Sequence, residues 1–283
     1  MRKLENQGFT LIELLIVIAI IAILLTILAP ALHKAREQAK LSMCASNQRQ
    51  VVMALKTYAS EFQMRMPPAV TKRARPSLLA RFKADGDTAV GFYLRRYLSN
   101  ADAFNCPLSA FDKYAKYDID GQLYTYQDLY DDPTILQNSV SANKMQNCSY
   151  ILLWNYEAFN KVSVRENNSN NMYGMPFIGP DKSNNGLVIC DSFYFSNQLG
   201  GEVSYHWSAN HPIANGDKYK SRDYPYFLLK GTEQEFETNY DLHEITLNAG
   251  YTDGHVEKYL SGNTIRQQAV SGWAAMYITE KWK

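Results

Sequence analysis

The sequence has little of several residue types that mark specialised proteins. It contains only four cysteines in 283 residues, too few for a small protein built on a disulfide framework. Fifteen glycines and ten prolines exclude a collagen-like chain, and an aromatic content of 13% excludes a disordered tail. The net charge is only +1, so the chain as a whole has no general attraction for nucleic acid.

Motifs of known catalytic sites are also missing from the sequence. We find no P-loop, no nucleophile elbow and no HExxH pair, and we therefore expect no enzymatic activity. Metal-ligating residue types do gather in the last third of the chain, but their spacing matches no metal motif. We expect structural roles for them and no bound metal, with a divalent-metal site as the alternative; they are His206, His211, His243, Asp253 and His255.

Two charged stretches suggest weaker alternatives. Asp118-Ile119-Asp120-Gly121 alternates hard oxygen ligands as a calcium loop does, but it lacks the rest of the EF-hand spacing. Residues 69–86 hold five basic side chains without interleaved aromatic residues, which is more typical of a solvated loop than of a DNA-binding surface. We expect no cofactor, with calcium as a minor alternative, and no nucleic-acid partner.

One long hydrophobic run stands out against this soluble-looking background. Between Phe9 and Leu32, 20 of the 24 residues are apolar, and Glu13 is the one ionisable group. As a helix, the segment 9–29 would span about 31 Å, which matches the hydrocarbon thickness of a bilayer. A carboxylate in such a helix is costly when it is unpaired in lipid. Glu13 therefore implies a partner or a function, unless it lies solvated at headgroup depth.

The residues around the start of this run follow a distinctive pattern. A short basic leader ends in Gly8 and is followed by the string FTLIELLIVIAIIAIL. This pattern closely resembles the signal of type IV prepilins and type II secretion pseudopilins. The resemblance implies that prepilin peptidase cleaves after Gly8 and methylates the new amino terminus at Phe9. It also matches Glu13 to the family's assembly glutamate and Pro30 to the proline that bends the helix where it leaves the membrane.

This resemblance would make the chain a filament subunit. The implied partners are prepilin peptidase, copies of the chain itself, other pilins or pseudopilins, an inner-membrane assembly platform and membrane lipid. The implied location is the bacterial inner membrane, crossed once, with the carboxy-terminal domain in the periplasm or in an envelope filament. In a filament, Glu13 would pair with the amine of Phe9 from a neighbouring subunit. Such pairing removes two uncompensated charges from a low-dielectric region.

An ordinary secretory signal is the competing interpretation of the same segment. Arg2 and Lys3 form a basic region, and Ala29-Pro30-Ala31 looks like a cleavage site. However, the apolar run exceeds the usual length of about 7–15 residues, and a proline lies inside the cleavage site. Basic residues both precede and follow the run, so the positive-inside rule does not decide its orientation. We favour the prepilin signal.

The helix signal continues beyond Pro30. Apolar residues recur at intervals of three and four from Leu41 to Phe62, which predicts an amphipathic stem packed against a domain. Pro67-Pro68 ends this pattern. The predicted organisation is a leader at 1–8, a transmembrane helix at 9–29, a stem at 30–66 and an exported globular domain at 67–283.

The rest of the chain has short apolar runs between turn residues, which predict an antiparallel sheet. Alternation on both sides of Asp253-Gly254 predicts a hairpin over 245–260, with a two-residue turn whose central residues both have positive φ. Nine residues separate His243 from Asp253, and this His-x9-Asp-Gly pattern resembles the carboxy-terminal domain of many prepilin-like proteins. The expected fold is α+β and pilin-like, with a long amino-terminal helix packed on an antiparallel β-sheet domain.

The cysteines lie at positions far apart in the chain, namely Cys44, Cys106, Cys148 and Cys190. An exported body would face an oxidising space in which disulfides form. We favour a Cys44–Cys106 bridge, because it would join the stem to the body. Four reduced and buried cysteines are the equally weighted alternative.

The favoured function is structural: a subunit of a type II secretion pseudopilus or of a type IV pilus-like filament, with the pseudopilus slightly preferred. A second interpretation is a membrane-anchored envelope binding module, such as one for carbohydrate. It is suggested by the Tyr- and Asn-rich body, which is larger than a minimal pilin needs. The two functions differ at Glu13, because polymerisation requires this residue and an anchored binder does not.

Overall fold

The structure is a computed structural model of the chain. It describes residues 10–63, 65–68, 70, 77–82, 88–110, 114, 116–140, 145–154, 186–199, 202–213, 217–218, 227–232, 238–268 and 274–279. The chain divides into two compact units, residues 1–42 and residues 43–283. The division falls inside the predicted stem, so that the second half of the stem belongs to the larger unit.

The first unit consists of the amino-terminal part of helix α1, which runs from Leu11 to Glu61. Leucine, isoleucine and alanine dominate this part and favour the helix. Thr10 begins it with a capping box, because its hydroxyl accepts a hydrogen bond from the backbone of Glu13, whose carboxylate accepts one from the backbone of Thr10. Pro30 lies inside α1, and the helix continues through it.

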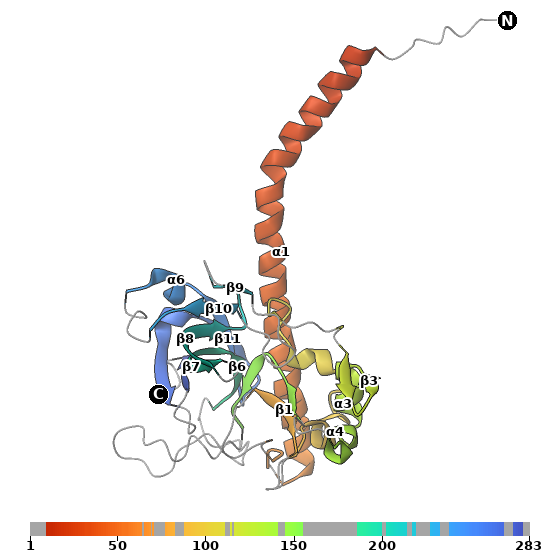
Figure 1. Cartoon of the computed structure of the whole chain (residues 1–283), viewed down its shortest axis with the longest axis vertical. Helices are drawn as coiled ribbons and strands as arrows, with labels where there is room; N and C mark the ends of the chain where they lie inside the picture. Colours follow the sequence, from red (N-terminus) through yellow and green to blue (C-terminus); the bar gives the residue numbers. More distant parts are fainter. Residues whose placement is uncertain are drawn as a thin grey trace, which may run out of the picture. The chain divides into compact units, whose positions relative to one another are not determined.

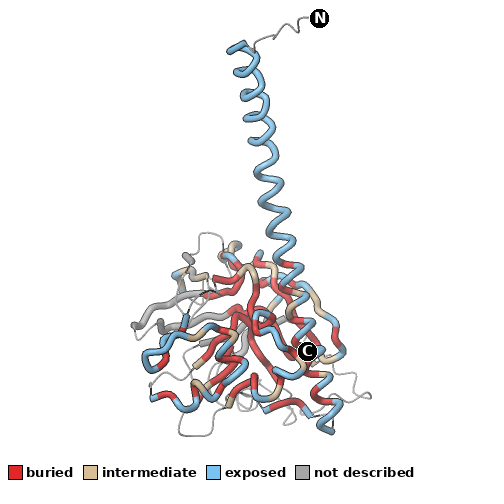
Figure 2. The backbone as a smooth tube through the Cα atoms, turned by 90° about the vertical axis from the view of Figure 1, so that its right-hand side faces the viewer, coloured by how far each residue is buried: buried red, intermediate tan, exposed pale blue. Residues whose placement is uncertain are grey.

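Every residue of α1 from Leu11 to Lys40 is exposed (Figure 2). From Leu11 to Leu28, exposed leucine, isoleucine and valine side chains surround the helix on all faces. Among the described residues, α1 is the one helix long and apolar enough to cross a membrane, judged by its length and composition. A helix that is apolar on all sides needs either lipid or other helices around it.

The second unit begins with the last part of α1, which has one buried face. Val51 and Leu55 are fully buried there, whereas Met53 on the opposite face is half exposed. In Figure 1, strands β7, β8 and β11 lie on one side of this part of α1, and the short helices α3 and α4 lie on the other. The helix ends at Glu61, five residues before the predicted boundary, and Gln63 follows with a left-handed φ of +53°.

In the described part of the second unit, all paired strands are antiparallel. A four-stranded sheet has the order β12 (Val256–Leu260), β11 (Thr246–Tyr251), β6 (Leu187–Asp191) and β5 (Tyr150–Leu152). A six-stranded sheet has the order β13 (Thr264–Gln268), β14 (Ala274–Thr279), β7 (Phe193–Leu199), β8 (Glu202–Ala209), β10 (Phe227–Lys230) and β9 (Asp217–Lys218). Two small pairs complete the strands: β1 (Leu78–Arg81) with β4 (Met145–Asn147), and β2 (Tyr117–Ile119) with β3 (Gln122–Tyr124).

Short helices connect the strands and cover the stem. They are α2 (Gly91–Leu94), η1 (Ala101–Phe104), α3 (Tyr126–Asp131), α4 (Thr134–Asn138), α6 (Tyr240–His243) and η3 (Ser261–Asn263). One core cluster joins the buried face of α1 to α2, α3 and one face of the four-stranded sheet. A second cluster lies among β6, β7 and β11. The fold is therefore α+β, with a long apolar amino-terminal helix followed by a domain of antiparallel sheets, and the predicted pilin-like class is confirmed.

The β11–β12 hairpin spans residues 246–260, but its turn differs from the predicted one. Strand β11 ends at Tyr251 and β12 begins at Val256, so that four residues form the loop. Gly254 has a φ of +100°, whereas Asp253 does not have a positive φ. A two-residue turn with two positive φ values forms instead at Asp120-Gly121, between β2 and β3.

Candidate functional site

The predicted processing residues Gly8 and Phe9 lie outside the described residues, as does the leader. Glu13 lies in the first turn of α1 and is bound by Thr10. Its Oε2 accepts hydrogen bonds of 2.8 Å from both the backbone nitrogen and the hydroxyl of Thr10. The carboxylate therefore has local partners within one subunit, and the Thr10 cap must be distinguished experimentally from any pairing between subunits.

Pro30 removes one backbone donor from α1, the one that would bond to the carbonyl of Thr26. The helix absorbs this loss without ending. One turn earlier, the hydroxyl of Thr26 donates a 2.8 Å hydrogen bond to the carbonyl of Ala22, so that the polar side chain is satisfied within the apolar segment. The position of Pro30 matches the end of the predicted membrane-spanning segment.

His243 and Asp253 lie at opposite ends of β11, because the nine residues between them include that entire strand. His243 ends α6 and packs against Gly262. A Cβ added at Gly262 would lie 3.1 Å from the Cβ of His243. Asp253 lies in the hairpin loop, where its carboxylate pairs with His255 and its carbonyl accepts a 2.9 Å hydrogen bond from Lys56. The His-x9-Asp-Gly pattern therefore marks the two ends of β11, and the side chains of His243 and Asp253 do not meet.

The residues predicted as a minor calcium alternative form the β2–β3 turn. Asp118 accepts a 3.1 Å hydrogen bond from the backbone of Gly121. The carboxylate of Asp120 accepts hydrogen bonds from the hydroxyl of Ser139 and the backbone of Val140. These hydrogen bonds explain why both aspartates occur at this turn. Calcium binding stays a prediction without further support.

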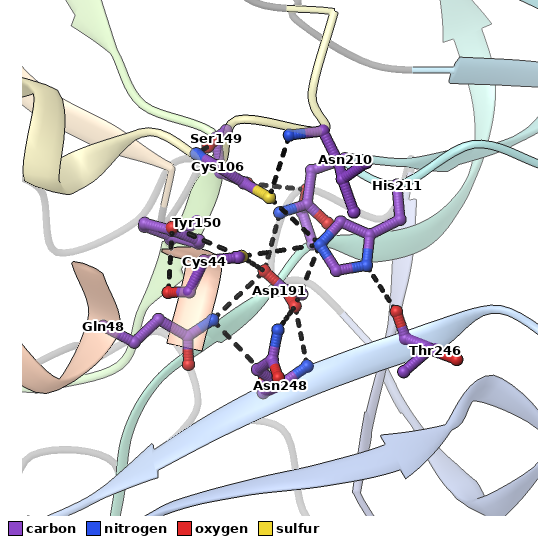
Figure 3. A network of polar contacts seen from close by, with 12 residues as sticks. Cys44, Gln48, Cys106, Ser149, Tyr150, Asp191, Asn210, His211, Thr246 and Asn248 are labelled. Atoms are coloured by element: carbon purple, nitrogen blue, oxygen red, sulfur yellow. Dashed lines mark hydrogen bonds and ion pairs between the residues drawn. The ribbon is translucent and has the colours of Figure 1, made fainter. Parts of the chain in front are cut away.

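Four potential metal ligands converge in the interior of the second unit (Figure 3). Their donor atoms all lie within 4.8 Å of one another, and none of the residues is more than 2% exposed. We call these residues, Cys44, Cys106, Asp191 and His211, the four-donor cluster.

The contacts within the four-donor cluster centre on the His211 Nε2 atom. It lies 3.1 Å from the sulfur of Cys106 and 3.5 Å from the sulfur of Cys44. The carboxylate of Asp191 lies 3.2 Å from the same nitrogen and 3.2 Å from the sulfur of Cys44. The other ring nitrogen of His211, Nδ1, donates to the carbonyl of Thr246. This bond orients the ring so that Nε2 points at the cluster.

Each member of the four-donor cluster comes from a different part of the fold. Cys44 lies on α1, and Cys106 follows η1, where its backbone donates to the hydroxyl of Ser149. Asp191 is the last residue of β6, at the point where the chain passes from the four-stranded to the six-stranded sheet. His211 follows the end of β8, beside that same crossing.

Amide groups surround the carboxylate of Asp191. Its Oδ1 accepts hydrogen bonds from Gln48 at 3.1 Å and from Asn210 at 2.8 Å. Its Oδ2 accepts two from Asn248, one from the backbone at 2.6 Å and one from the side chain at 2.9 Å. A buried carboxylate is tolerated only when such donors stabilise it, so these three polar side chains are part of the same arrangement.

The protonation of the cluster is shifted by its own members. Burial alone would lower the pKa of His211, but the charge of Asp191 and the contact with Cys106 outweigh burial and raise this pKa to about 9. Burial raises the pKa of Cys106, whereas the contacts with Cys44 and His211 lower it to about 7. Burial and the neighbouring Cys106 raise the pKa of Cys44. The cluster thus contains one easily ionised thiol beside a readily protonated imidazole.

The structure brings Cys44 and Cys106 close together, but the predicted disulfide between them is not formed. All four cysteines are free thiols and are buried. Cys148 and Cys190 lie outside the four-donor cluster, and burial raises the pKa of both. The sulfurs of Cys44 and Cys106 both lie beside His211 and Asp191. The prediction of a disulfide from the sequence did not take these two neighbours into account.

Among the described side chains of the predicted group, those of His243 and His255 lie outside the four-donor cluster. His255 stacks on Tyr251 with ring centroids 4.3 Å apart, at the hairpin loop. His206 lies on β8 opposite Ser196 and Lys230, and its side chain is outside the described part of the chain. No spacing signal links the members of the four-donor cluster, since folding alone brings them together. Asp191 is the one member with a local signal, because it is a carboxylate at the end of an apolar strand.

Comparison with known proteins concerns the amino-terminal segment. Residues 4–29 match the family model of the prokaryotic N-terminal methylation motif. No curated protein and no solved structure matches the chain. The α+β chain therefore carries a prokaryotic N-terminal methylation motif at the start of its apolar helix. This match supports a type IV pilin-like or pseudopilin-type precursor that prepilin peptidase processes, while the His-x9-Asp-Gly domain stays a prediction.

Proposed function

We propose that the protein is a structural, non-enzymatic subunit of a type IV pilus-like or type II secretion pseudopilus filament. The observation that carries the proposal is the methylation motif at residues 4–29, which overlaps the part of α1 that exposes apolar side chains on all faces, Leu11 to Leu28. In this proposal the segment 9–29 holds the processed subunit in the bacterial inner membrane. The globular domain lies in the periplasm until an assembly platform extracts the subunit into the filament.

The exposed helix supports assembly because its apolar surface requires a nonpolar environment. From Leu11 to Leu28, every large hydrophobic side chain is at least 45% exposed. Lipid supplies that environment in the membrane, and neighbouring copies of the same helix supply it in a filament. Transfer between the two changes little hydrophobic energy, since lipid tails and packed helices are similarly apolar. Specific contacts must therefore decide the register of assembly.

Glu13 is the specific contact that we propose. A charged side chain in a membrane helix costs about 3 kcal/mol on insertion scales at the helix centre, and a carboxylate near the end costs less. Pairing with the methylated amine of Phe9 in a neighbouring subunit would neutralise both charges. The hydrogen bonds from Thr10 hold the carboxylate near the start of the helix, close to Phe9 in sequence.

Two substitutions separate the charge of Glu13 from its role as a helix cap. Glu13→Gln keeps a side chain that suits the capping box but removes the charge, whereas Thr10→Val removes the hydroxyl of the cap and keeps the charge. The assay measures cleavage of the full-length chain and its content in sheared filaments, in cells with the complete assembly machinery. Glu37→Gln, at an exposed position further along α1, is the control.

We expect Glu13→Gln to be cleaved normally but to enter filaments at least tenfold less than the wild type. Thr10→Val and Glu37→Gln should enter them at close to the wild-type level. Normal incorporation of Glu13→Gln would contradict the pairing of charges. A wild-type chain that is cleaved but never enters filaments would favour a membrane-anchored binding module instead.

A further inference from the structure

The four-donor cluster combines ligand types that suit a soft or borderline divalent metal ion. Two cysteine sulfurs, one imidazole nitrogen and one carboxylate oxygen form a donor set typical of zinc in proteins. Calcium and magnesium prefer oxygen ligands throughout, so the two sulfurs argue against them. The chemistry of the donors therefore selects a transition metal of the zinc type.

The distances within the cluster fit a tetrahedral site. Donor atoms around a tetrahedral zinc ion lie about 3.3–3.8 Å apart, given metal–ligand bonds of about 2.0–2.3 Å. The His211 nitrogen lies 3.1–3.5 Å from the carboxylate of Asp191 and from the two sulfurs, and the Asp191 carboxylate lies 3.2 Å from the sulfur of Cys44. All the donor atoms lie within 4.8 Å of one another. Small outward movements of the side chains would accommodate an ion at the centre.

The surrounding hydrogen bonds are those of a preorganised metal site. A metal-binding histidine usually donates its second ring nitrogen to a carbonyl or carboxylate, and His211 donates Nδ1 to the carbonyl of Thr246. Ligating carboxylates are likewise held by hydrogen bonds, and Asp191 accepts four from amide groups. These hydrogen bonds orient His211 and Asp191 toward the centre of the cluster. The bonds to Asp191 also stabilise part of the negative charge of a site with two thiolates and a carboxylate.

We propose that the four-donor cluster binds one structural zinc-type divalent ion. The ion bonds to the two sulfurs as thiolates, to Nε2 of His211 and to the carboxylate of Asp191. The thiol protons and the proton on Nε2 leave to solvent, and no electron is transferred. Four protein ligands in a fully buried position leave no place for a substrate, so the role is structural. The ion would fix the second half of α1 to the junction of the two sheets.

The test measures metal in the full-length chain, purified in detergent with a peptide tag that contains no histidine and without chelators. Cells are grown with added zinc, and bound zinc is measured by elemental mass spectrometry. We expect about one zinc ion per chain. Cys106→Ser and His211→Gln should each lose it at least tenfold, whereas the control Cys148→Ser, which changes a buried cysteine outside the cluster, should keep it.

Cobalt replacement gives a measurement that does not depend on folded variants. The wild-type chain is stripped of metal and loaded with Co²⁺, which reports tetrahedral geometry through intense visible bands and thiolate ligation through a near-ultraviolet band. Both bands are expected. A wild-type chain with less than about a tenth of an ion and no cobalt bands overturns the proposal, whether its thiols are free or joined as a Cys44–Cys106 disulfide. Zinc that persists in both cluster variants also overturns it. Filament assembly is not needed for any of these measurements.

Discussion

Leu55 offers a direct test of whether the second half of α1 is part of the folded domain. Its side chain is fully buried and belongs to the core cluster that joins α1 to the helices and the four-stranded sheet. Truncation to alanine removes buried methyl groups and leaves a cavity. Such truncations cost about 3–4 kcal/mol where the surroundings cannot collapse. Helix propensity does not contribute to this loss, because alanine favours a helix at least as well as leucine.

Met53 is the matched control for Leu55→Ala. It lies two residues away on the same helix and is 49% exposed, so Met53→Ala should cost about 1 kcal/mol or less. The assay is urea unfolding of the full-length chain in detergent, followed by tryptophan fluorescence, since Trp154 is buried in the same core cluster. With a slope of about 3 kcal/mol per M, Leu55→Ala should lower the midpoint by about 1 M. Equal and small effects of the two substitutions would refute the packing of the stem.

Three further predictions follow from other contacts. Gly250→Ala should destabilise the domain by about 1–3 kcal/mol in the same assay, because the new Cβ would lie 2.8 Å from Ile189 and 3.1 Å from Val52; an unchanged midpoint would contradict this close approach. Thr125→Ala should cost about 1 kcal/mol at pH 7 by removing the capping box of α3. The backbone N–H of Thr125 and, to a lesser extent, its hydroxyl lower the pKa of Asp128. Thr125→Ala removes only the hydroxyl's share, which is present above the unfolded pKa and is lost as the pH falls through the folded one. Thermal unfolding at pH 7 and pH 3 should therefore show a smaller difference between variant and wild type at pH 3. A zinc chelator should lower the melting temperature of the zinc-loaded wild type and leave His211→Gln unchanged, and equal shifts in the two would count against the proposed ion.

Periodicity in the sequence was sufficient to predict α1 and its buried face. The intervals of three and four from Leu41 onward predict the side on which Val51 and Leu55 are buried. The alternation around Asp253-Gly254 likewise predicts the strands β11 and β12. Both patterns work because they depend on local geometry, namely the repeat of a helix and that of a strand.

The turn and the four-donor cluster could not be predicted in the same way. The loop at Asp253 is set by contacts with distant residues, including the hydrogen bond from Lys56. In the sequence, Gln48 is a polar residue within the apolar stripe of the stem. The structure explains its position, because its side-chain amide donates a hydrogen bond to Asp191. Cys44, Cys106 and His211 are separated by dozens of residues, so only the packing of α1 against the sheet junction brings them together. The sequence therefore pointed to Cys44 and Cys106 as a pair and to His211 within a different group, and Asp191 was not among the predicted residues.

The first residue of the mature chain tests the central claim most directly, since the proposed assembly into filaments depends on prepilin processing. Mass spectrometry of the protein isolated from membranes reads this residue without any substitution. Cleavage after Gly8 with an N-methylated Phe9 is the result that the account predicts. An intact Met1 would leave a plain membrane anchor, and a start near Leu32 would indicate an ordinary secretory signal; either result would contradict the proposed function.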